Sequence, residues 1–155
     1  MKQAPISVAM ALLYQNQRFL MQLRDDKPEQ ILYSGKWGLF GGHLESAELP
    51  KAGIIREIKE EINYNLQEPD FFRCYGDSKV TRYIFYAPLK VDIKSLKLSE
   101  GQDLALVSLS NIHLGYYYSD KIAEKRYLGN IHRQILLDFA FFALNNLPEF
   151  DYEGD

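Results

Sequence analysis

The sequence predicts one α/β domain in which a mixed β-sheet lies between helices. The predicted elements follow the order strands, helix, strands, helix, which favours such a sandwich over a βαβ repeat. The chain has 155 residues, 46% of them hydrophobic, which suits a single domain with a sizeable core. No internal repeat, low-complexity block or linker divides it, so we expect one domain over residues 1–155.

The first predicted element is a β-hairpin. The apolar runs Ile6–Tyr14 and Arg18–Arg24 are separated by a polar turn at Gln15-Asn16-Gln17. Short apolar runs on either side of a polar turn are typical of paired antiparallel strands. We therefore expect these two runs to form neighbouring strands of the sheet.

The next part of the chain leads into the first helix. Residues 25–36 form a polar loop, and Trp37–Phe40 is a short apolar strand that runs into a Gly-Gly pair. We expect Trp37 to pack in the core beneath this glycine turn. A helix is predicted from near Leu49 to Asn63, because Pro50 suits the first turn of a helix.

The second half of the chain repeats strands and then a helix. Phe71–Gly76 and Lys79–Leu89 are predicted to form a second hairpin around Asp77-Ser78. Asp103–Leu109 is predicted to be another strand. Residues 130–147 read as a long helix, apolar on most faces and so largely buried. The core is expected to span about residues 4–146, with residues 147–155 a frayed acidic tail.

Composition excludes several classes of protein. The net charge of -3 gives no general attraction to nucleic-acid polymers or anionic membranes. No apolar stretch is long enough to span a bilayer. The single cysteine, Cys74, excludes an intramolecular disulfide and a cysteine-based zinc site, and we expect it to be a buried or half-buried strand residue. These features fit a protein of the reducing cytoplasm.

Residues 56–62, REIKEEI, place three carboxylates within five residues. On a helix that turns by about 100° per residue, Glu57, Glu60 and Glu61 share an arc of about 100°. The isoleucines of this helix form a separate stripe that faces the core. Taken alone, the carboxylates fit a solvated helix face. Because they repel one another and border the apolar stripe, they also fit a cleft that holds Mg²⁺ or Mn²⁺.

The stretch from Gly42 to Tyr64 resembles the Nudix box, G-x5-E-x7-R-E-U-x-E-E-x-G-U, in which U is a bulky apolar residue. Six fixed positions of the motif are present, at Gly42, Glu48, Arg56, Glu57, Glu60 and Glu61. Asn63 stands where the family has glycine. Asparagine is the next best residue for a left-handed backbone, so we expect a left-handed helix end and an unaltered site.

The resemblance implies a Nudix α/β/α sandwich and a magnesium-dependent hydrolase of nucleoside diphosphates linked to another moiety. The metal ligands that it implies are the backbone carbonyl of Gly42 and the side chains of Glu57, Glu60 and Glu61. It implies a structural ion pair between Glu48 and Arg56. We expect Glu61 to be the ligand nearest the nucleophilic water.

Further candidates come from loops near the box. Glu100 precedes a strand, where relatives often supply a general base or an extra metal ligand, with Gln102 and Asp103 as weaker candidates; a solvated turn is the alternative. Arg24, His43 and Glu45 are candidate substrate-binding residues. The alternative for each is an ordinary surface position. Tyr116–Tyr118 could stack on a base, although core or rim packing is favoured. His113 and His132 are expected to be structural.

The resemblance leaves the substrate open among nucleoside triphosphates, nucleotide sugars and ADP-ribose. The region 79–81 has no proline of the kind that many ADP-ribose hydrolases carry there. A different reading is a non-catalytic Nudix-fold module that senses a nucleotide or sugar. Such relatives usually lack box carboxylates, and this chain has kept them. Nudix proteins are often dimers, so a homodimer is also open.

Overall fold

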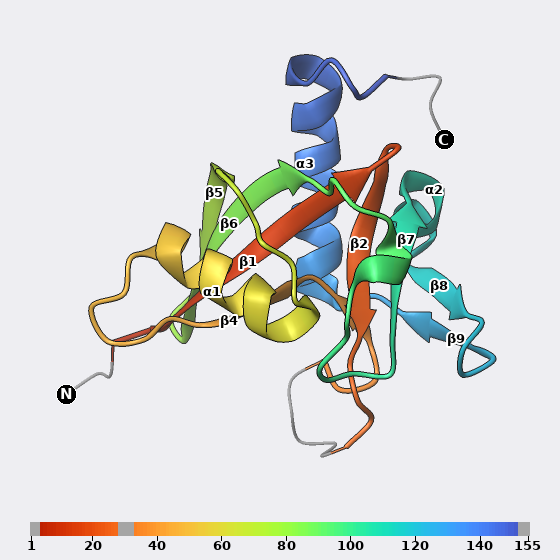
Figure 1. Cartoon of the computed structure of the whole chain (residues 1–155), viewed down its shortest axis with the longest axis horizontal. Helices are drawn as coiled ribbons and strands as arrows, with labels where there is room; N and C mark the ends of the chain where they lie inside the picture. Colours follow the sequence, from red (N-terminus) through yellow and green to blue (C-terminus); the bar gives the residue numbers. More distant parts are fainter. Residues whose placement is uncertain (1–3, 28–32, 152–155) are drawn as a thin grey trace.

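The structure is a computed structural model that describes residues 4–27 and 33–151 (Figure 1). Residues 28–32 of the predicted loop therefore lie outside the described residues. The strands are β1 (Ile6–Gln15), β2 (Arg18–Leu23), β3 (Trp37–Gly38), β4 (Phe40–His43), β5 (Asp70–Gly76), β6 (Val80–Pro88), β7 (Asp103–Ser108), β8 (Tyr116–Ser119) and β9 (Glu124–Tyr127). The helices are α1 (Pro50–Ile62), α2 (Leu109–Leu114), α3 (Asn130–Asn146) and a 3-10 turn at Ile93–Ser95.

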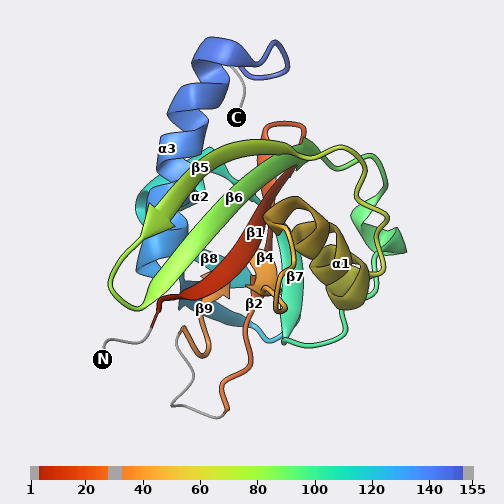
Figure 2. The ribbon, with the colours of Figure 1, turned by 90° about the vertical axis from the view of Figure 1, so that its left-hand side faces the viewer.

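A mixed sheet forms the centre of the molecule. Five strands follow the order β3-β2-β1-β6-β5, while β4 also pairs with β1 and β7 with β2. The pairing of β1 with β6 is parallel, and the other pairings in this sheet are antiparallel. Helix α1 covers one face, and α3 and α2 lie on the other, as Figures 1 and 2 show from two directions. The predicted α/β/α sandwich with a mixed sheet is confirmed.

Side-chain alternation along β1 divides the core into two parts. Met10, Leu12 and Tyr14 point into the cluster beneath α3, while the residues between them pack beneath α1. Because successive side chains of a strand point to opposite faces, one buried strand can serve both clusters. The same rule places Gln22 of β2 on the α1 side, next to Leu20. The site therefore borders the α1 cluster.

The two predicted hairpins are present, and the residues between the strands explain them. Asn16 and Gln17 have φ angles of 51° and 60°, which is the backbone of a tight two-residue hairpin turn. In the β5–β6 turn, the Asp77 carboxylate accepts hydrogen bonds from the backbone N–H groups of Lys79 and Val80, at 2.7 and 2.8 Å. Side-chain capping of this kind is why aspartate is frequent in turns.

Helix α1 begins and ends as the sequence predicts. Pro50 occupies the first turn, and Asn63 follows the last helical residue with φ 54° and ψ 41°. The left-handed conformation lets the Asn63 N–H donate to the carbonyl of Lys59. Ile54, Ile58 and Ile62 are fully buried, which confirms the apolar stripe.

Some predicted strands have different bounds. The predicted strand Trp37–Phe40 is split at Leu39, because β3 pairs with β2 while β4 pairs with β1. Strand β7 ends at Ser108, whose hydroxyl accepts the N–H of Asn111 and caps α2. Helix α2 and the β8–β9 hairpin had not been predicted. Trp37 is fully buried, as expected.

Two predictions about the core are wrong. Cys74 lies in a strand, but it is exposed, since β5 is an edge strand and its α1-side face is only partly covered. The chain after α3 was expected to fray from residue 147, yet Phe150 is buried and stacks on Phe19 with ring centroids 5.9 Å apart. Glu149 accepts a hydrogen bond from the hydroxyl of Tyr14 at 2.9 Å. The core therefore extends to residue 150, and residues 152–155 lie outside the described part.

Helix α3 is less uniformly buried than its composition suggests. Its inner face, which includes Ile135, Leu136 and Phe139, packs on the sheet, but Phe141 is 75% exposed. In residues 4–27 and 33–151, no helix is both long enough and apolar enough to cross a membrane.

Candidate active site

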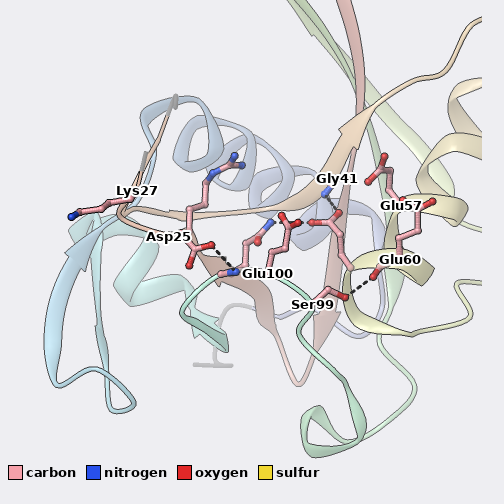
Figure 3. A pocket seen from close by; sticks show the side chains of 11 residues that line it. Asp25, Lys27, Gly41, Glu57, Glu60, Ser99 and Glu100 are labelled. Atoms are coloured by element: carbon pink, nitrogen blue, oxygen red, sulfur yellow. Dashed lines mark hydrogen bonds between the residues drawn. The ribbon is translucent and has the colours of Figure 1, made fainter. Parts of the chain in front are cut away.

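A polar cavity of about 320 Å³ lies between the C-terminal half of α1, the end of β2 and the loop before β7. Its lining residues are Gln22, Arg24, Asp25, Lys27, Gly41, Glu57, Glu60, Glu61, Ser99, Glu100 and Gly101. In Figure 3, Glu57 and Glu60 lie on one side, Lys27 on the other, and Asp25 and Glu100 between them. The cavity therefore brings together residues that are far apart in the sequence.

The glycine pair at the start of the box permits close packing at the cavity. Gly41 has φ +153°, and a Cβ there would overlap the backbone of Ala9 in the neighbouring strand. At Gly42 a Cβ would lie 2.5 Å from the carboxyl group of Glu57. Gly41 therefore needs glycine, because a side chain there would displace the neighbouring strand, whereas a side chain at Gly42 would push the Glu57 carboxylate away from the glycine turn.

Glu61 is held by two hydrogen bonds. Its Oε1 accepts the backbone N–H of Gly41 at 2.9 Å, and its Oε2 accepts from the amide of Gln22 at 3.2 Å. Burial, and next the carboxylate of Glu57, raise the pKa of Glu61 to about 8, although both hydrogen bonds and Arg24 act in the opposite direction. A bound cation would relieve this unfavourable burial of negative charge.

Arg56 and Glu48 form the ion pair that the box implies. The Nε and Nη2 atoms of Arg56 donate to the two carboxylate oxygens of Glu48 at 2.8 and 2.9 Å. Glu48 also accepts the backbone N–H of Glu45 at 2.9 Å. The hydrogen bonds from Arg56 hold the pKa of Glu48 at about 2. This two-pronged geometry ties the loop before α1 to the helix.

Glu57 and Glu60 also contact Arg56. Its Nη1 atom lies 3.0 Å from Glu57 Oε1 and 3.2 Å from Glu60 Oε2. The side chain of Glu57 is 14% exposed and that of Glu60 is 58% exposed. With these carboxylates turned toward Arg56 and Glu61 held by Gly41, the described residues contain no three acidic, histidine or cysteine side chains already gathered around one point.

The wall opposite α1 carries positive charge. Arg24 and Lys27 line the cavity, and the Arg24 guanidinium is close enough to Glu61 to lower its pKa. Glu100, exposed, lines the cavity between these walls. The site therefore combines three carboxylates on α1 with the two cations Arg24 and Lys27 across from them, beside the carboxylate of Asp25.

The structure separates other predicted residues from the cavity. His43 and Glu45 are exposed and do not line it, and Glu45 Oε1 lies 3.6 Å from Arg56 Nε instead. The Gln102 amide donates to the carbonyl of Arg24 at 2.9 Å, outside the cavity lining.

The remaining candidates are structural or lie elsewhere. The carboxylate of Asp103 accepts a hydrogen bond from Ser119 at 2.7 Å. Buried His132 accepts the Leu39 N–H on Nδ1 at 3.0 Å, which agrees with a structural role, whereas His113 is exposed. Tyr116–Tyr118 lie in β8, outside the cavity lining.

Sequence reasoning missed Gln22, Asp25, Lys27 and Ser99. Gln22 had a usable signal, because it is the one polar side chain inside the otherwise apolar run FLMQL and is only 7% exposed. A buried polar side chain needs a partner, and here the partner is Glu61. Ser99 gave no signal; its hydroxyl donates to the backbone carbonyl of Glu60 at 2.7 Å, and its N–H donates to that of Glu61 at 2.9 Å.

Comparison with known proteins agrees with this geometry. The NUDIX domain family matches residues 4–127. The chain is similar to the MutT protein of Methanosarcina mazei Go1, with TM-score 0.67 and 22% identity over 92% of this chain and 97% of that one. It is similar to a MutT NUDIX hydrolase of Burkholderia pseudomallei, with TM-score 0.66 and 19% identity over 87% and 98%.

A third similar structure is the NUDIX domain of Shewanella oneidensis NrtR complexed with ADP ribose, with TM-score 0.68 and 16% identity over 90% of this chain and 89% of that one. No curated protein matches the sequence. At these identities the solved structures establish the fold. The match of the family to residues 4–127 goes further, and on that basis the chain belongs to the Nudix hydrolase family.

Proposed function

We propose that this protein hydrolyses the diphosphate linkage of a nucleoside diphosphate joined to another moiety, with Mg²⁺ or Mn²⁺ as its metal. The candidate substrates are nucleoside triphosphates, nucleotide sugars and compounds of the ADP-ribose type. One observation carries the proposal: a single cavity holds the α1 carboxylates on one wall and Arg24 and Lys27 on the other. A magnesium diphosphate needs both signs of charge, carboxylates for the metal and cations for the phosphates.

The residues present fit a hard divalent cation. Carboxylate oxygens are the ligands that Mg²⁺ and Mn²⁺ prefer, and Glu57, Glu60 and Glu61 line the same cavity. The backbone of Gly42 lies against Glu57. We assign these residues as the ligand set. A bound metal supplies Lewis acidity and lowers the pKa of a bound water.

The protein's own groups position the reaction. The Gly41 N–H and the Gln22 amide hold Glu61 in one orientation, and the Glu48–Arg56 pair fixes the glycine loop against α1. Arg24 offers a positive charge to the phosphate groups. In phosphoryl transfer, positioning and electrostatic stabilisation provide most of the catalysis. Contacts that orient Glu61 and place a cation near the phosphates therefore supply what this chemistry needs from the protein.

Glu100 is the proposed general base or additional metal ligand. It lines the cavity from the loop before β7. The ends of this loop are fixed, because the Ser99 N–H donates to the Glu61 carbonyl at 2.9 Å and the Gln102 N–H to the Leu23 carbonyl at 2.8 Å. Glu100 therefore sits on a short loop that is anchored at both sides of the site.

A screen of nucleotide substrates tests the proposed function. The purified protein is incubated with Mg²⁺ and each candidate in ¹⁸O-labelled water, and products are identified by mass. We expect release of a mononucleotide with a second phosphorylated product or pyrophosphate, and the label shows which atom water attacks. The absence of turnover across all three substrate classes, with Mg²⁺ and with Mn²⁺, would contradict the proposal.

The alternative is a binding module that does not hydrolyse its ligand. The similar structure of the NrtR NUDIX domain is a complex with ADP ribose, so a domain of this fold can bind such a ligand. Calorimetry with ADP-ribose and Mg²⁺ separates the two functions. Tight binding with no product favours the module, while product formation that Glu61→Gln abolishes favours the enzyme.

A further inference from the structure

The cationic wall of the cavity comes from one short segment, residues 24–27. Arg24, Asp25 and Lys27 line the cavity, while Asp26 between them pairs with a distant residue, Arg126. Because Lys27 is exposed and lies at the far end of the cavity from Glu57, its placement depends on how this segment is held (Figure 3).

Arg126 of β9 holds the segment by several hydrogen bonds. Its Nη1 donates to Asp26 Oδ1 at 2.6 Å and to the carbonyl of Gly35 at 3.0 Å, and its Nη2 donates to Asp26 Oδ2 at 3.3 Å. Arg126 also donates to Glu124 Oε2 at 2.6 Å. It therefore joins both described ends of the loop between β2 and β3, and its side chain is only 21% exposed.

The hairpin that carries Arg126 is itself anchored. The indole N–H of Trp37 donates to the carbonyl of Tyr117 at 3.1 Å, and the two rings are 5.5 Å apart in an edge-on arrangement. Ser119 donates to Asp103 of β7 at 2.7 Å. Since Trp37 is fully buried, Arg126 extends from a base fixed to the core.

Other contacts hold mainly the backbone of the segment, while Arg126 binds its charged side chain. Ser34 donates to the backbone carbonyls of Asp25 and Asp26 at 2.9 and 2.7 Å, and the Gly101 N–H donates to Asp25 Oδ2 at 3.3 Å. These bonds fix the backbone of the segment. The side chain of Asp26, which directly precedes Lys27, is bound by two hydrogen bonds from Arg126, with Gln102 as a weaker second partner.

We propose that Arg126 is a positioning residue that acts through Asp26 to hold residues 24–27 against the cavity, and so sets the affinity for the phosphate groups of the substrate. This inference rests on the proposed function, because it assigns Arg24 and Lys27 to phosphate binding. The carboxylates assigned to the metal lie on α1, which the Arg126 hydrogen bonds do not reach. Loss of Arg126 therefore weakens binding and leaves the chemical step unchanged.

The test compares five variants with the natural protein. Arg126→Met and Asp26→Asn each remove the contact, the double variant removes both partners, and Arg126→Lys keeps the positive charge. Glu124→Gln is the control, because it leaves the bonds of Arg126 to Asp26 and Gly35 in place. KM and kcat are measured on the substrate that the screen identifies. The Kd for inorganic pyrophosphate with Mg²⁺ is measured by calorimetry, so that binding is read independently of turnover.

We expect Arg126→Met and Asp26→Asn each to raise KM and the pyrophosphate Kd about fivefold, which is the upper range for a partly exposed ion pair. The kcat of both variants should stay within about twofold of the natural value. The double variant should add little to either single variant, since both remove the same contact. Arg126→Lys should recover part of the affinity, and Glu124→Gln should bind as the natural protein does.

Unchanged KM and Kd in both Arg126→Met and Asp26→Asn would overturn the inference. An equal loss of affinity in Glu124→Gln, or a fall in kcat that matches the rise in KM, would also overturn it. The pyrophosphate measurement separates this inference from the proposed function. If no substrate is hydrolysed, the proposed function fails, yet weaker pyrophosphate binding in Asp26→Asn still supports the role of Arg126.

Discussion

Buried His132 should make the protein progressively less stable as the pH falls from 7 to 5. The imidazole is 2% exposed, and its Nδ1 accepts the Leu39 N–H, so the folded protein holds it neutral. Burial, assisted by the charges of Arg24 and Arg82, lowers the pKa of His132 to about 3. In the unfolded chain, histidine takes up its proton near pH 6.5.

The direction in which stability changes with pH follows from proton binding. Between pH 6.5 and 3 the unfolded chain binds one more proton at His132 than the folded protein, so stability rises with pH and is lost as the pH falls. One such proton contributes about 1.4 kcal/mol per pH unit when fully bound. Integrated from pH 7 to pH 5 with an unfolded pKa near 6.5, His132 removes about 1.9 kcal/mol from the free energy of unfolding.

Urea unfolding at the two pH values measures this term. His132→Asn keeps an acceptor for the Leu39 N–H without a titrating ring, and the pH 7 to pH 5 difference should be smaller by about 1.9 kcal/mol than in the natural protein. His132→Gln serves as a second neutral variant if the first is too unstable. His113→Asn, at an exposed position, is the matched control and should keep the full difference. An unaltered pH dependence in both His132 variants would refute the reasoning.

Three further predictions concern the helix end, the core and the cavity. Asn63→Gly should raise the free energy of unfolding by about 0.5 kcal/mol with kcat unchanged, because the residue is left-handed and glycine adopts that conformation without strain; a loss of stability in urea unfolding would contradict this. Ile58→Ala should lower the free energy of unfolding by about 2–5 kcal/mol, since the side chain is fully buried, and a cost below about 1 kcal/mol would show that the site is not tightly packed. Glu100→Gln should lower kcat at least about a hundredfold if Glu100 is the general base, and unchanged rates and pH–rate profiles would remove it from that role.

Most of the fold could be predicted because its elements are encoded locally. Pro50 and Asn63 mark the ends of α1. The apolar runs of β1 and β6 define strands, and the short turns that follow β1 and precede β6 give each of them one hairpin partner. The β8–β9 hairpin was missed because its strands are four residues each and its tyrosines suggest packing as readily as pairing. Phe150 was missed because its burial depends on Phe19 and Phe139, which the sequence does not place beside it.

Part of the site could also be predicted from the sequence, and part could not. The α1 carboxylates and the Glu48–Arg56 pair follow from helical spacing and a motif, and the structure places these groups together. Gln22 and Lys27 line the cavity because sheet pairing and loop contacts bring together residues that are far apart in the sequence. The spacing of residues along the chain does not predict such contacts. Such non-local contacts depend on tertiary packing, so the cationic wall of the cavity became visible only in the folded chain.

The measurement that tests the account most directly is kcat of Glu61→Gln with Mg²⁺, on the substrate that the screen identifies. The substitution keeps the size of the side chain and an acceptor for the Gly41 N–H, but removes the negative charge. We predict a fall of at least about a hundredfold in kcat, which is about 2.7 kcal/mol in the barrier, with unchanged folding by circular dichroism. Glu45→Gln, outside the cavity, should keep full activity. Natural turnover by Glu61→Gln would contradict the assignment of this carboxylate to the catalytic metal site.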